Sequence, residues 1–164
     1  MSLKVELLES TFSQIKAKET EFMTYFYTIL FADYPEVKPL FANTHMKKQA
    51  KQLFKSLVLV VENLRNPNVL SNALKGLGTR HVHYGVLPKH YPMVGNTLLK
   101  TLSTCLDNAW TPTTEQAWGE AYTVVTELML SGTDYPAEIL TPHAQQSLGA
   151  SRVEDNKAVP HSLV

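Results

Sequence analysis

The spacing of the apolar residues constrains this fold more than any other feature, because they recur at three- and four-residue steps in one segment after another. The first such pattern runs from Leu3 to Ile15, and similar patterns continue as far as Gly132. This is the period of an amphipathic helix, and there is no convincing run of the period-two alternation that indicates a half-buried strand. No pattern repeats at the lengths typical of solenoids. The sequence therefore predicts an all-α domain with a wrapped rather than a repeated core.

Prolines and polar clusters divide the first half of the chain into separate helices. Thr20 is expected to cap the second helix, because its side chain can accept a hydrogen bond from a first-turn amide, and Pro35 ends that helix. Residues 42–45 are polar and predict a loop. The long helix predicted over residues 46–64 is apolar around much of its circumference, which is typical of a central helix that several others contact.

The second half of the chain carries further signals for helix starts and ends. A break at Pro67 precedes a shorter helix, and the apolar stripe of that helix includes His81. Gly85 permits a left-handed turn, and Pro88 suits the first turn of the next helix. Thr111, followed by a proline, predicts the start of the last helix.

Length and charge exclude several classes of protein. A chain of 164 residues suits one domain, which we assign to residues 1–132, and residues 133–164 lack periodicity and are expected to form a tail or linker. Fifteen basic and fifteen acidic residues cancel, so no basic patch indicates nucleic acid or an anionic membrane as a partner. No apolar stretch approaches the roughly 20 residues of a membrane span. With a single cysteine, Cys105, expected in the core, and no signal-peptide pattern, we expect a soluble, cytoplasmic protein.

His81 is the first candidate for chemistry, because it falls on the apolar face of its helix. Such a histidine is either a satisfied core residue or a metal ligand, and taken alone it favours the core residue. The surrounding segment, GTRHVHYGVLPKHYPMVG from Gly78 to Gly95, changes this interpretation. It resembles the haem-ligand segment of bacterial flavohaemoglobin-type globins, in which a histidine precedes a Tyr-Pro-x-Val-Gly motif at this spacing.

The resemblance covers roughly residues 3–130, through FY at 26–27, PEV at 35–37, LF at 40–41 and AWxxAY at 117–122. The periodicity alone leaves a helical bundle or a globin open, and the resemblance implies the globin fold, with helices wrapped around a haem pocket. It implies haem b as the cofactor. Since the chain ends soon after this region, we expect a single-domain globin without reductase domains, similar to Vitreoscilla-type bacterial haemoglobins.

On the proximal side of the haem, the resemblance implies that His81 binds the iron and that Tyr91 hydrogen-bonds near it. Val94 is expected to line the proximal floor. Arg80 either pairs with a haem propionate, since guanidinium binds carboxylates in a bidentate manner, or is solvated. Haem is a broad apolar disc whose iron takes a neutral imidazole, which fits a single histidine on a packed helix face.

On the distal side, the resemblance implies that Tyr27 is the distal tyrosine and that Phe41 packs on the haem. Gln49 is expected as the distal polar residue and Leu53 as its apolar neighbour one turn later on the same helix face. A donor such as Tyr27 or Gln49 can stabilise bound oxygen by about 1–3 kcal/mol, which predicts slow oxygen release. The alternatives are a tyrosine with an exposed hydroxyl and a solvated glutamine.

Other residues depart from the family or are assigned to the surface. His45, His83 and His90 are expected to be solvated, although a flexible loop could bring His45 to the iron. The family places a glutamate after the last helix to bond the proximal tyrosine and histidine, whereas residues 130–133 contain no carboxylate and only Asp134 could substitute. Losing this group weakens the imidazole as a donor to iron and disfavours oxygen activation.

These observations predict a haem-binding globin that reversibly binds oxygen, nitric oxide and carbon monoxide, for oxygen transport or nitric oxide scavenging. One alternative is a nitric oxide dioxygenase that depends on an external reductase and in which Tyr27 and Gln49 hold the oxygen. Another is the gas-sensing module of a longer signalling protein. A haem-free interaction domain would not need His81, Phe41 and Tyr27 together, so these residues disfavour it.

Overall fold

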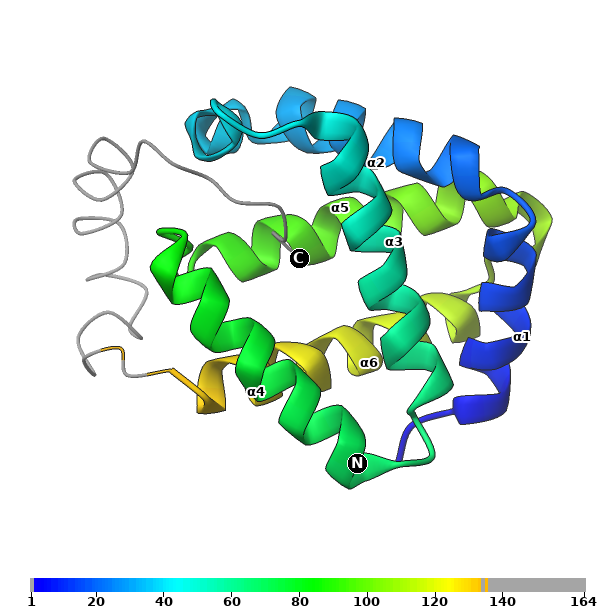
Figure 1. Ribbon diagram of the computed structural model, residues 1–164. Coiled ribbons are helices and arrows are strands. Elements are labelled where there is room, and N and C mark those ends of the chain that lie inside the picture. Colours follow the sequence, from blue (N-terminus) through cyan, green and yellow to red (C-terminus); the bar gives the residue numbers. More distant parts are fainter. Residues whose placement is uncertain (1, 134, 136–164) are drawn as a thin grey trace.

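The computed structural model describes residues 2–133 and 135, and within these residues the chain is helical and contains no strand (Figure 1). This confirms the predicted all-α class. The expected tail falls mostly on residues outside the described ones. The elements in chain order are α1 (Val5–Lys16), α2 (Glu19–Asp33), the 3-10 helix η1 (Pro35–Phe41), α3 (Met46–Glu62), α4 (Pro67–His83), α5 (His90–Leu106), the 3-10 turn η2 (Asp107–Ala109) and α6 (Pro112–Ser131).

Two helix pairs make the most extensive contacts, α2 with α5 and α4 with α6. Figure 1 shows α3 crossing in front of α5 and α6, with α4 to one side and α1 to the other. Among the described residues, no helix combines the length and apolar character that a membrane span requires.

The core consists of a large aromatic and aliphatic cluster and a smaller one. In the large cluster Phe12 stacks on Phe54, with ring centroids 5.7 Å apart, and Trp118 Nε1 donates to Thr11 Oγ1 at 3.0 Å, which ties α6 to α1. Cys105 belongs to this cluster, as predicted. The smaller cluster joins α4 to α6 and to the start of α5, and it contains Leu70, Leu74, Leu77, Val86, Tyr91 and Met129.

The caps and turns predicted from the sequence are confirmed at some helix ends and wrong at others. Thr111 caps α6 by accepting from the amide of Thr114 at 3.2 Å, and Gly85 adopts a φ of 84°, as predicted. Thr20 does not cap α2, because the turn after α1 lets the helix start at Glu19 and places Thr20 inside it. Pro88 lies in the turn before α5 rather than in its first turn.

The backbones of α4 and α6 approach each other closely at Gly78. A Cβ atom at this position would lie 2.7 Å from the carbonyl carbon of Met129. Farther along the same contact, Thr79 Oγ1 donates to the carbonyl of Gly132 at 2.9 Å. The absence of a side chain at Gly78 therefore allows the two backbones to pack directly, one turn before His81.

Candidate functional site

An apolar cavity lies among α2, η1, α4, α5 and α6, with an unfilled volume of about 590 Å³ that includes its opening. Most of its wall is aliphatic or aromatic. The lining residues are Phe26, Tyr27, Leu30, Val37, Leu40, Phe41, His81, Val86, His90, Tyr91, Val94, Tyr122, Val125 and Met129.

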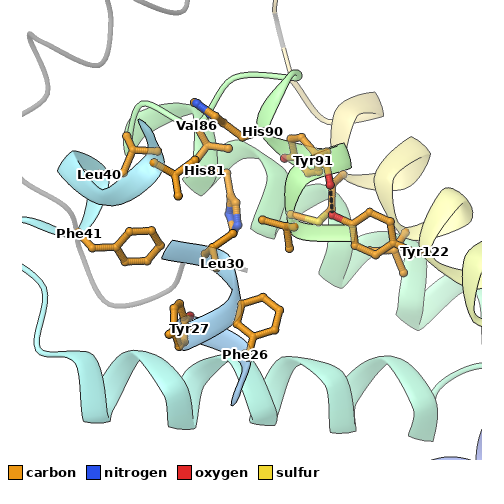
Figure 2. Close-up of a pocket in the computed structure, with 14 residues that line it drawn as sticks. Phe26, Tyr27, Leu30, Leu40, Phe41, His81, Val86, His90, Tyr91 and Tyr122 are labelled. Atoms are coloured by element: carbon orange, nitrogen blue, oxygen red, sulfur yellow. Dashed lines mark hydrogen bonds between the residues drawn. The ribbon is translucent and has the colours of Figure 1, made fainter. Parts of the chain in front are cut away.

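The imidazole of His81 projects into this cavity (Figure 2). Its Nδ1 lies 2.8 Å from the carbonyl oxygen of Leu77, one turn earlier in α4. Because a carbonyl oxygen only accepts, Nδ1 carries the proton and Nε2 keeps its lone pair. Burial lowers the pKa of His81 to about 4, and the charge of Arg80 contributes in the same direction. The ring is therefore neutral near pH 7, which is the form that binds a metal ion.

Tyr27 contributes a buried hydroxyl from α2. Its ring meets Phe26 and Phe41 edge-on, with centroids 5.0 and 5.6 Å apart. Burial raises the pKa of the phenol, and Gln49 is close enough to offset part of this increase. Among the described residues, the hydroxyl has no hydrogen-bond partner of ordinary geometry. Gln49 is itself fully buried, so neither the exposed hydroxyl nor the solvated glutamine considered above describes this site.

Tyr91 and Tyr122 build the wall beside His81. The Tyr91 ring is stacked near the imidazole, with centroids 6.3 Å apart, but its buried hydroxyl has no hydrogen-bond partner among the described residues. Tyr91 thus meets His81 by a ring contact, and the hydrogen bond expected near His81 stays a prediction. The backbone carbonyl of Tyr91 instead accepts from Tyr122 Oη at 2.7 Å (Figure 2). A Cβ at Gly95 would lie 2.6 Å from the Tyr122 ring, so this glycine makes room for the tyrosine.

A second apolar cavity adjoins the first, with an unfilled volume of about 560 Å³. Leu53, which was expected beside the distal glutamine, lines this second cavity and not the first. Val94 lines both and so forms part of the wall between them, together with Phe26 and Met129. Because Leu53 lies on α3, the second cavity extends the apolar space of the first toward α3.

Two basic residues lie elsewhere than the sequence suggested. Arg80 is exposed, and its guanidinium lies near Gly76 rather than in the cavity wall. His90 was expected to be solvated, but it is 4% exposed and lines the cavity, because the turn before α5 folds its ring inward. His83 and His45 are exposed as expected, and His45 also caps α3 by accepting from the amide of Lys48.

The region after α6 also bears on the proximal side. Residues 130–133 carry no carboxylate, and Asp134 lies outside the described residues. Tyr135 donates its hydroxyl hydrogen to the carbonyl of Val86, in the turn that follows α4. Its proximity contributes to raising the pKa of Tyr91, although burial is the larger cause. Nothing in the sequence pattern marked Tyr135 or His90 as part of this site.

The fold and the site together define a class of protein. A flat apolar cofactor that needs one neutral nitrogen ligand fits this cavity, because Nε2 of His81 is unprotonated and the Tyr27 hydroxyl is buried in the wall. The helical architecture and this donor set are those of a haem-binding protein.

The chain belongs to the globin family, whose profile matches residues 24–129. It is 27% identical over 128 residues to a flavohemoprotein of Vibrio cholerae and 32% identical over 130 residues to one of Bacillus cereus, in each case across 77% of this chain and 32% of the relative. The chain thus spans about a third of the length of these curated relatives. The resemblance to flavohaemoglobin-type globins is confirmed.

Solved structures support the same assignment. A bacterial globin from Campylobacter jejuni is 28% identical, with a TM-score of 0.68, over 78% of this chain and 92% of that one. An engineered carbene transferase from Rhodothermus marinus matches 92% of this chain and 99% of its own length, with the same TM-score of 0.68 and 24% identity. The second likeness shows the fold alone.

Proposed function

We propose that this globin binds haem b through Nε2 of His81 and reversibly takes up a diatomic gas such as oxygen, nitric oxide or carbon monoxide. The observation that carries the proposal is the neutral His81 imidazole in an apolar cavity whose wall also holds the buried Tyr27 phenol. When bound, haem supplies an iron coordination position for the gas. The similarity to flavohemoproteins supports the choice of cofactor.

The chain's own residues have separate tasks in this proposal. Leu77 holds the proton of His81 on Nδ1, so that Nε2 stays available. Tyr27 offers a hydrogen bond to a polar gas ligand from a hydroxyl that is buried in the cavity wall. Phe41 and Val94 exclude water from the cavity, which strengthens that hydrogen bond.

A nitric oxide dioxygenase that works with an external reductase is the second candidate. The flavohemoprotein relatives and the buried pair of Tyr27 and Gln49 favour it. We place it second because, among the described residues, Tyr91 has no hydrogen-bond partner on the proximal side, and a carboxylate there would strengthen His81 as a donor. Nitric oxide consumption in the presence of oxygen and a supplied reductant distinguishes an enzyme from a carrier.

The first test is the absorption spectrum of the purified protein, ferric, reduced and then exposed to each gas. We expect a Soret band that shifts with each gas. His81→Ala should lose stoichiometric haem uptake, whereas His83→Ala, an exposed residue two positions later in α4, should keep it. The absence of a Soret band after reconstitution with haem, or equal uptake by the two variants, would contradict the proposal.

A further inference from the structure

His90 is a buried polar residue in the cavity wall to which no task has been assigned. Its side chain lines the cavity together with Val86 and Leu40, and only 4% of its surface is exposed. Figure 2 shows it beside Val86, at the opposite end of the view from Tyr27. A buried polar group normally has a partner for each of its hydrogen-bonding atoms.

One nitrogen of this ring is already occupied. The backbone amide of Leu87 donates to His90 Nδ1 at 2.9 Å. Because Nδ1 accepts a hydrogen bond, it carries no proton, and the neutral ring carries its proton on Nε2. Burial, aided by the charge of Lys89, lowers the pKa of His90 to about 4, so this neutral tautomer is the form present near pH 7. His90 therefore has one donor, the Nε2–H group.

The other polar groups in the wall have different tasks. His81 donates from Nδ1 to Leu77, and Tyr122 donates to the carbonyl of Tyr91. Tyr27 comes from α2, and Tyr91 lies against the imidazole of His81, near the Tyr135 and Tyr122 phenols. Arg80, which the sequence suggested as a carboxylate partner, lies outside the wall. Within the described residues that line this cavity, α5 thus offers two donors without a partner, the Tyr91 hydroxyl, whose ring lies against the His81 imidazole, and the Nε2–H group of His90.

We propose that His90 donates its Nε2–H hydrogen bond to a carboxylate of the bound cofactor and thereby slows cofactor loss. This inference rests on the proposed function, in which the cofactor is haem and the carboxylate is a propionate. A carboxylate against a wall of aliphatic and aromatic groups has few partners, and burying it unpaired is costly. The role is one of binding, and His90 takes the place in which Arg80 was expected.

Two substitutions separate this role from the structural one. Glutamine and glutamate at position 90 have the same shape, and each has an oxygen that can accept from the Leu87 amide, so both should preserve the turn. His90→Gln also keeps an N–H donor, whereas His90→Glu presents a carboxylate to the propionate. Circular dichroism and urea unfolding of the two apo-proteins check that the turn is equally stable in both.

The measurement is the rate at which each holo-protein transfers haem to excess apomyoglobin, followed in the Soret band near pH 8. We expect His90→Glu to lose haem about tenfold faster than His90→Gln, as for the loss of a charge-assisted hydrogen bond. Reconstitution with haem dimethyl ester, which has no carboxylate, should bring the two rates together.

Equal rates with native haem, or a difference that persists unchanged with the ester, would overturn the proposal while leaving the haem-globin assignment intact. Failure of the wild-type protein to take up haem would refute the proposed function and, with it, this inference.

Discussion

Gly78→Ala tests whether the contact between α4 and α6 positions His81. A Cβ at residue 78 would lie 2.7 Å from the carbonyl carbon of Met129 and closer still to its oxygen, whereas ordinary contact begins at 3.4 Å. The obstacle is helix backbone, which cannot rotate away as a side chain does. The two helices would have to separate, and His81, one turn later on α4, would move with its helix.

Gly76→Ala is the matched control, because a Cβ there would meet only the Arg80 guanidinium, at 3.7 Å. Each alanine gains about 1 kcal/mol of helix propensity over glycine. The difference between the two variants therefore isolates the clash, and overpacking of this kind costs about 1–3 kcal/mol. We expect the free energy of unfolding of the apo-protein, measured in urea, to be lower for Gly78→Ala than for Gly76→Ala by that amount.

The same two variants report on the site. If α4 carries His81 away from its place, Gly78→Ala should also lose haem faster than Gly76→Ala. Equal free energies of unfolding would refute the claim that the backbones are in direct contact. A loss of stability without faster haem loss would show that the contact supports the fold but does not position the imidazole.

Three further predictions follow from the cavity and the helix ends. Tyr27→Phe should raise the oxygen dissociation rate in stopped-flow measurements about tenfold, because it removes a buried donor, whereas Tyr25→Phe, on the exposed side of α2, should not. His90→Gln should make the free energy of unfolding of the apo-protein depend less on pH in the acid range. The folded-state pKa of His90, about 4, lies below the ordinary 6.5, so stability is lost as pH falls between these values; the free energy of unfolding should fall less steeply in the variant, by up to about 1.4 kcal/mol per pH unit. Thr111→Ala should cost about 1 kcal/mol in urea unfolding, through loss of the α6 cap, and exposed Thr113 should tolerate alanine.

The helices were predictable because their signal is local. A helix that buries one face repeats its apolar residues at a fixed spacing, and the start of α6 coincides with a threonine that can cap a helix and a proline that suits its first turn. Thr20 shows the limit of such signals, since a residue that can cap a helix is equally able to lie inside one. Which of these occurs depends on how tightly the preceding turn closes.

The site residues that belong to a recognisable motif could be predicted from the sequence. Those that reach the site only through tertiary structure could not. His81, Tyr27 and Phe41 line one cavity, although they come from three elements, and the resemblance had grouped them. His90 follows a lysine and lies near an exposed proline, so its surroundings in the sequence indicate a surface residue. Its burial depends on the turn that brings the Leu87 amide onto its ring, which no local pattern encodes.

Arg80 could have been placed more accurately from helix geometry alone. Adjacent residues of an α-helix point about 100° apart, so the residue before a ligand on the buried face tends to point toward solvent. The structure shows this outcome, with the Arg80 guanidinium lying back over Gly76.

The hydrogen bond from His81 to Leu77 joins two residues of the same helix. The hydrogen bond that orients the imidazole therefore lies within α4. Sequence changes where α4 meets α6 can shift the ligand nearer to or farther from the cavity centre while its ring plane stays fixed relative to its own helix. Evolution can thus adjust the strength of the bond to a metal by repacking one helix crossing, without rebuilding the hydrogen bonding of the ligand itself.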